Sequence, residues 1–155
     1  MSEGKIYYFL KNYLLSKGLT LIAGEPPDGS DNVRRVEIRS KNRSGIGSKD
    51  SYKIDLIFLK DDNLILIELK PTYNQKDIDK LNTITTERLD DLFDALKERC
   101  GITKSEIKNI VKCIGVGSLN SHNIPSDFIG FVVKDEGLVD IQYGSKTGNL
   151  AFLEN

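Results

Sequence analysis

The chain has 155 residues, and its 22 Lys and Arg nearly balance 23 Asp and Glu, which leaves a formal net charge of −1. This length suits a single domain, residues 1–155, that buries a core without needing a disulfide or a structural metal. The near-neutral charge argues against a protein that coats nucleic acid by phosphate neutralisation alone. The longest aliphatic run, residues 64–67, is far short of the ~20 apolar residues that span a bilayer, so we expect no membrane segment.

The sequence also predicts the compartment. The residues after Met1 do not follow the pattern of a secretory signal or a basic transit peptide. The two cysteines, Cys100 and Cys113, have neither metal-ligand spacing nor a redox Cys-x-x-Cys arrangement. We therefore expect a reduced, cytoplasmic protein.

The first predicted elements are a helix and a short strand. Apolar residues recur at helical spacing from Ile6 to Leu14, Ser2 is available as the N-cap, and Gly18 stands where a helix would end. Residues 19–23 follow as a short strand before a turn-rich connection.

Three further strands are predicted as an antiparallel meander. Residues 33–39 alternate strictly between apolar and charged side chains, which indicates a half-exposed strand. A glycine- and serine-containing loop covers residues 40–50. Two apolar strands, residues 52–59 and 64–70, then flank a polar turn and form a hairpin.

The second half of the chain predicts a crossover helix and three more strands. A helical pattern covers residues 77–99, where three threonines can split it, and Gly101 lies just past its end. Residues 109–117 are apolar on both faces, as in a buried strand parallel to the one before the helix. Residues 128–133 and 138–142 form a C-terminal hairpin. The predicted fold class is α/β with a mixed sheet.

The hairpin of residues 52–70 brings chemical groups together. If its turn is centred between Asp61 and Asp62, Asp55 lies directly opposite Glu68. Opposed side chains have Cβ atoms about 4.5 to 5.5 Å apart, and two carboxylates so placed repel unless a cation or proton lies between them. The two-residue period of a strand puts Lys70 on the same face as Glu68.

This group of side chains suits phosphodiester hydrolysis. Two carboxylates can hold Mg²⁺, a hard ion that prefers oxygen ligands, and Mn²⁺ can substitute for it. The ion lowers the pKa of a bound water and neutralises phosphate charge. Lys70, kept protonated by two neighbouring anions, can orient the attacking water or stabilise charge on the phosphoryl oxygens.

Asp55, twelve intervening residues and then Glu68-Leu69-Lys70 resemble the signature of the PD-(D/E)XK nuclease superfamily, although Ile54 replaces the proline of the family's name. The family core is a helix, a three- to four-stranded antiparallel meander, a helix and a strand, which is similar to the predicted order. The resemblance implies a restriction-endonuclease-like core, as in restriction enzymes and Holliday-junction resolvases.

The resemblance also implies roles for individual residues. Asp55 and Glu68 would be metal ligands, with the backbone carbonyl of Leu69 as a further ligand, and Lys70 would be the catalytic lysine. Many members add an acid from the first helix, where Glu3 is the candidate, and some place a glutamine after the motif, near Gln75.

Charge is unevenly distributed along the chain. Residues 33–53 contain seven bases and two acids, whereas residues 77–106 contain eight acids and five bases. The basic stretch precedes Asp55, so it could bind phosphates beside the predicted metal site. The candidate nucleic-acid-binding residues are Arg34, Arg35, Arg39, Lys41, Arg43 and Lys49. DNA is the expected partner, and we keep open a homodimer that cuts both strands.

Other interpretations stay open. Asp55 and Glu68 could be solvated charges in cross-strand ion pairs, and the basic loop could be free of ligand. The domain could also be a catalytically inactive nuclease fold that binds nucleic acid or a protein partner. A structural subunit of a larger complex is a third interpretation, with the acidic helix of residues 77–99 as its contact surface.

Overall fold

The fold was determined from a computed structural model, which describes residues 1–155 except 28, 30, 40–50, 149 and 154–155. The helices are α1 (Glu3–Ser16), α2 (Gln75–Glu87) and α3 (Leu89–Cys100). The strands are β1 (Thr20–Gly24), β2 (Glu37–Ile38), β3 (Tyr52–Lys53), β4 (Leu56–Lys60), β5 (Asn63–Thr72), β6 (Asn109–Ser118), β7 (Phe128–Val133) and β8 (Val139–Tyr143). None of the helices in this described part is long and apolar enough to cross a membrane.

A mixed sheet of six strands forms the centre of the domain, in the order β1-β4-β5-β6-β7-β8. Strand β5 is parallel to β6 and β6 to β7, whereas the other neighbours are antiparallel. The predicted α/β class, the mixed sheet and the C-terminal hairpin are therefore confirmed.

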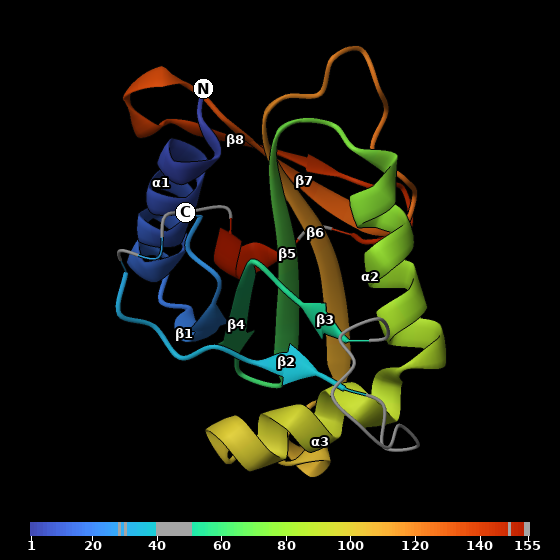
Figure 1. Cartoon of the computed structure of the whole chain (residues 1–155). Coiled ribbons are helices and arrows are strands. Elements are labelled where there is room, and N and C mark those ends of the chain that lie inside the picture. Colours follow the sequence, from blue (N-terminus) through green and yellow to red (C-terminus); the bar gives the residue numbers. More distant parts are fainter. Residues whose placement is uncertain (28, 30, 40–50, 149, 154–155) are drawn as a thin grey trace.

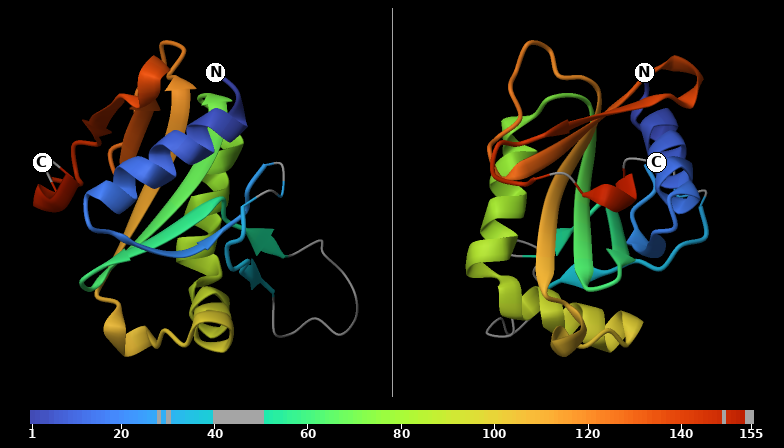
Figure 2. Two further views of the ribbon diagram at one scale, coloured as in Figure 1. Left: turned by 90° about the vertical axis from the view of Figure 1, so that its left-hand side faces the viewer. Right: turned by 180° about the vertical axis from the view of Figure 1, so that it is seen from behind.

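Helices cover both faces of the sheet, with α1 on one side and α2 on the other (Figures 1 and 2). Ile6, Leu10 and Leu14 of α1 belong to a buried cluster that includes Phe58 and Ile67 of the sheet. A second cluster, on the opposite face, combines residues of α2 and α3 with Ile57, Leu64 and Leu66. Alternate residues of β4 and β5 therefore point into different cores.

The residues predicted to begin and end the first helix lie at the two ends of α1. The Ser2 side chain accepts a hydrogen bond of 3.2 Å from the Lys5 amide, as expected of an N-cap. Gly18 adopts a left-handed φ of 84° just after the helix, a conformation that glycine tolerates best.

The predicted meander is wrong in its first strand. Within residues 33–39 only β2 is a strand, and it pairs with β3 in a separate two-stranded sheet. Strand β1 instead lies beside β4 and completes the meander β1-β4-β5. Val36 and Ile38 are buried as the alternation predicts, but alternation shows which side chains are buried and not which strand is the partner.

Two predicted elements are divided. The strand of residues 52–59 is interrupted at residues 54 and 55, between β3 and β4. The helix of residues 77–99 becomes α2 and α3, separated by Arg88, whose φ of −125° is not helical. Thr85 and Thr86 bond back to the carbonyls of Leu81 and Asn82 before this break, and such bonds bend helices.

Candidate functional site

Asp55 and Glu68 meet where β4 separates from β3. The hairpin register pairs Leu56 with Ile67 and Ile57 with Leu66, which confirms the predicted register. Continued by one residue, it puts Asp55 opposite Glu68. Asp55 lies in the bend directly before β4 begins, and Glu68 lies within β5.

The two acids are joined by reciprocal hydrogen bonds between side chain and backbone. Oε2 of Glu68 accepts a hydrogen bond of 2.9 Å from the amide of Asp55. Oδ2 of Asp55 accepts one of 2.8 Å from the amide of Leu69. Carboxylate oxygens thus take the amides that a regular ladder would pair with carbonyls, which explains why the strand can break here without leaving buried donors unpaired.

The acids lie in an environment that disfavours two negative charges. Burial, and then the charge of Glu68, raise the pKa of Asp55 from its ordinary 3.8 to about 7. Burial also raises the pKa of Glu68, whose residue is only 2% exposed, although Lys80 opposes that rise. The pair therefore favours an added proton or cation.

A lysine that the sequence analysis did not select supplies one cation. Nζ of Lys80, on α2, lies 2.7 Å from Oε1 of Glu68, and it also donates to the backbone carbonyl of Lys53. Asp77, one helical turn earlier, is a further buried acid that was missed. Helical spacing could have identified Asp77 and Lys80, because both adjoin the buried face of α2 that contains Leu81.

Lys70 lies at the margin of the carboxylate pair. Its Nζ is 3.7 Å from Oδ1 of Asp77 and 4.0 Å from Oε1 of Glu3. Burial alone would lower the pKa of Lys70, but the charges of Asp77, Asp55 and Glu3 outweigh it and raise that pKa. The ammonium is therefore kept protonated between the first turns of α1 and α2.

The other residues suggested by the resemblance have different contacts. Among the described residues, Glu3 contacts the site through Lys70, whose Nζ lies 4.0 Å from Oε1 of Glu3. Gln75 donates to Oδ1 of Asp79 at 3.0 Å and accepts a bond of 2.9 Å from the Tyr73 hydroxyl. Its side chain is therefore held on the exposed side of α2.

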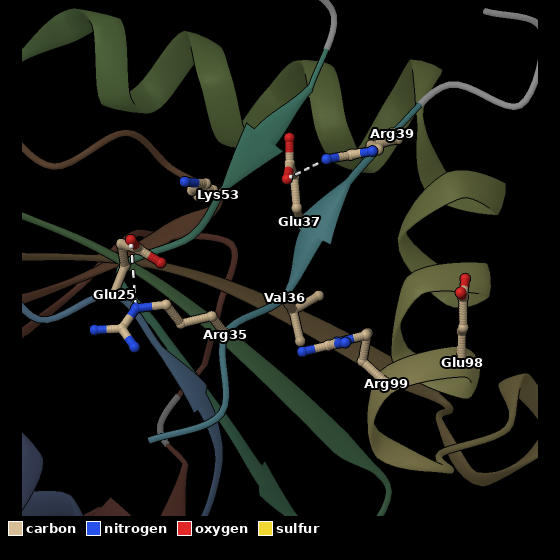
Figure 3. A pocket seen from close by; sticks show the side chains of 8 residues that line it. All are labelled: Glu25, Arg35, Val36, Glu37, Arg39, Lys53, Glu98 and Arg99. Carbon is tan, nitrogen blue, oxygen red and sulfur yellow. Dashed lines mark hydrogen bonds and ion pairs between the residues drawn. The ribbon is translucent and has the colours of Figure 1, made fainter. Parts of the chain in front are cut away.

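Part of the basic stretch lines a cavity of about 400 Å³ (Figure 3). The lining residues are Glu25, Arg35, Val36, Glu37, Arg39, Lys53, Glu98 and Arg99. Arg35 pairs with Glu25 at 3.6 Å and Arg39 with Glu37 at 3.0 Å. Lys53 and Arg99 form no ion pair within the described residues, so they are the cations of this cavity available for an anion.

The remaining basic candidates lie elsewhere. Arg34 is exposed, outside the cavity lining. Lys41, Arg43 and Lys49 lie outside the described residues. Sequence reasoning placed Arg99 in an acidic helix and so missed it; its approach to Val36 depends on how α3 packs against β2.

The carboxylate oxygens of Asp55 and Glu68 suit a hard divalent cation, but they are only two side chains and one of them already contacts a lysine. Among the described residues, no group of three or more His, Cys, Asp or Glu side chains is arranged to hold a metal. Two buried carboxylates with raised pKa values nevertheless favour positive charge, and their oxygens are the donors that Mg²⁺ prefers. One oxygen of Glu68 already contacts Lys80.

Comparison of the sequence with protein-family models and with curated proteins found no match.

Proposed function

We propose that the protein is a metal-dependent nuclease that hydrolyses phosphodiester bonds in nucleic acid, with DNA as the expected substrate and a core of the PD-(D/E)XK type. The observation that carries the proposal is the Asp55–Glu68 pair, fixed by the two backbone amides, with Lys70 beside it. Side chains held this firmly at a strand break cost little reorganisation during a reaction.

In this proposal Asp55 and Glu68, with the backbone carbonyl of Leu69, would hold Mg²⁺ or Mn²⁺. When bound, such an ion would lower the pKa of a coordinated water and neutralise phosphate charge. Lys70 provides a fixed positive charge for the phosphoryl oxygens, and the carboxylates that raise its pKa support that role over one as a free base. Glu3 and Asp77 act by holding the Lys70 ammonium in place.

The cavity of Figure 3 supports nucleic acid as the substrate. Lys53 precedes Asp55 by two residues, so its backbone adjoins the carboxylate pair, and its side chain lines the cavity together with Arg99. We assign these two cations to contacts with phosphates beside the scissile bond. Arg34, Arg35 and Arg39 extend the basic surface, two of them with their charge partly offset by glutamates.

A second candidate function is a catalytically inactive domain on the same scaffold that binds nucleic acid or a protein partner. The contact between Lys80 and Glu68 favours it, because an ammonium ion can satisfy a buried carboxylate without a metal. The two candidates differ in their response to divalent ions.

The deciding experiment is a cleavage assay in Mg²⁺ or Mn²⁺ on supercoiled plasmid, branched DNA, single-stranded DNA and RNA. Asp55→Asn can still accept the Leu69 amide, so it should fold, yet cleavage should fall by at least about 100-fold, beyond the loss typical of an outer-shell partner. Asp79→Asn, on the exposed side of α2, is the matched control and should cleave normally. Absence of cleavage on all four substrates, or full activity in Asp55→Asn, would reject the nuclease proposal.

A further inference from the structure

Lys80 occupies a position where it interacts directly with the proposed metal ligands. Its ammonium group contacts Oε1 of Glu68 at 2.7 Å and the carbonyl of Lys53, so it bridges β5 and the end of β3. The Glu68 side chain is 3% exposed, whereas that of Lys80 is 24% exposed. The lysine thus enters the site from a more open side, on a flexible stem.

The other carboxylate oxygens of Asp55 and Glu68 show why the contact between Lys80 and Glu68 matters. Oε2 of Glu68 and Oδ2 of Asp55 are bound to backbone amides that the fold holds in place. Within the described residues this leaves Oδ1 of Asp55 free of hydrogen bonds, and Oε1 of Glu68 in contact with a cation. A divalent ion that used both acids would meet the Lys80 ammonium at Glu68, and two cations sharing one carboxylate oxygen repel.

We infer that Lys80 is an internal cation that competes with the divalent ion for Glu68. In the metal-free protein it neutralises a buried carboxylate, which would be costly to leave unpaired. Binding of the ion displaces the ammonium group from Oε1. Lys80 is thereby a positioning residue that acts through Glu68, and it sets the metal concentration at which the site fills. The inference rests on the proposed function, because it requires that Asp55 and Glu68 bind a metal.

Lys70 differs from Lys80 in its contacts. Its ammonium is paired with Asp77 and Glu3 and makes no ion pair with Asp55 or Glu68 within 4.0 Å among the described residues. A divalent ion on the carboxylate pair therefore need not move Lys70, but it must move Lys80. The two lysines near the site should respond differently to substitution.

The test is titration of the metal-free full chain with Mn²⁺ in a calorimeter, for wild type, Lys80→Met and the matched control Lys76→Met. Lys76 is exposed in the first turn of the same helix, so its removal changes the net charge equally without touching Glu68. Lys80→Met should bind Mn²⁺ at least about tenfold more tightly than wild type, and Lys76→Met should match wild type. Lys80→Arg, which keeps the charge, should restore the wild-type affinity.

A second readout is the melting temperature in EDTA and in excess Mn²⁺. In EDTA, Lys80→Met should have a lower melting temperature than wild type, because Glu68 loses its partner. Excess Mn²⁺ should raise the melting temperature of Lys80→Met by more than it raises that of wild type. Should Lys80→Met fail to fold, Lys80→Gln keeps a hydrogen-bond donor and should also tighten Mn²⁺ binding.

The outcomes separate the two proposals. If wild type binds Mn²⁺ and the neutral Lys80 variants bind it equally or more weakly, competition is refuted while the metal site stands. If neither wild type nor any Lys80 variant binds Mn²⁺, the proposed function fails as well. Binding that appears only in the neutral variants would support competition.

Discussion

The side chains of Asp55 and Glu68 each accept a hydrogen bond from the backbone of the opposite arm of the hairpin. Glu68 accepts one of 2.9 Å from the amide of Asp55, and Asp55 accepts one of 2.8 Å from the amide of Leu69, the residue after Glu68. Neither side chain can move far without breaking the junction of β4 and β5. Two like charges are therefore held close together by the fold itself. The pH dependence of stability and the affinity of the site for a cation both depend on how that repulsion is relieved.

The first prediction concerns pH. Because the folded-state pKa of Asp55 is raised to about 7 from 3.8, the folded protein retains a proton that the unfolded chain has lost between about pH 4 and pH 7. In EDTA, the free energy of unfolding should fall as the pH rises through this window. Glu68, whose pKa is also raised, contributes in the same direction. Urea denaturation at a series of pH values measures this slope.

Asp55→Asn is the control for the pH prediction. It keeps the acceptor for the Leu69 amide but has no charge to lose, so its stability should vary less with pH than that of wild type. A slope identical to that of wild type would show that Asp55 does not titrate in this range.

The second prediction concerns the cavity lined by Lys53 and Arg99. If these cations contact phosphates, Lys53→Ala and Arg99→Ala should each weaken binding to duplex DNA and reduce the slope of log affinity against log salt by about one. Fluorescence anisotropy at several salt concentrations, in Ca²⁺ or EDTA to limit cleavage, provides the measurement.

Lys97→Ala is the matched control for Arg99, since Lys97 is an exposed base on the same helix that lines a different hollow. Its affinity and salt slope should equal those of wild type. An equal loss in all three variants would indicate a general effect of net charge and no specific contact at the cavity.

The third prediction concerns the packing beside Glu68. A Cβ atom at Gly115 of β6 would lie 2.7 Å from Cδ2 of Leu69 and from Cδ2 of Leu10, both fully buried. Gly115→Ala should therefore lower the free energy of unfolding by about 1 to 3 kcal/mol, as overpacked cores do. Urea denaturation should detect the loss.

Gly4→Ala is the comparison for the packing prediction, because nothing lies within 4 Å of a Cβ at that position in α1. It should leave stability unchanged or raise it slightly, since alanine favours helix more than glycine does. A Gly115→Ala protein as stable as Gly4→Ala would mean that the Leu10 and Leu69 side chains can make room for the added Cβ atom at no cost.

Much of the fold followed from local patterns. Ser2 and Gly18 marked the ends of the first helix, and the apolar residues of β6 predicted a buried parallel strand. Asp55 and Glu68 could be paired because a short hairpin has few registers, and the apolar alternation of β4 and β5 selects one of them. These features depend on residues close together in the chain.

Other features depended on contacts between distant segments. The strand beside β4 proved to be β1 and not residues 33–39, since the period of a strand does not identify its neighbour. The hydrogen bonds that break the strand at Asp55 use side-chain oxygens in place of carbonyls, which alternation does not encode.

The local spacing of residues 52–70 is enough to predict that two carboxylates and Lys70 share one end of a hairpin. The cations that face these groups depend on how distant helices pack. The packing of α2 on the sheet brings Lys80 to Glu68, and that of α3 brings Arg99 to the basic cavity. Helix position is set by the burial of apolar faces across the whole domain, and no local pattern contains that information.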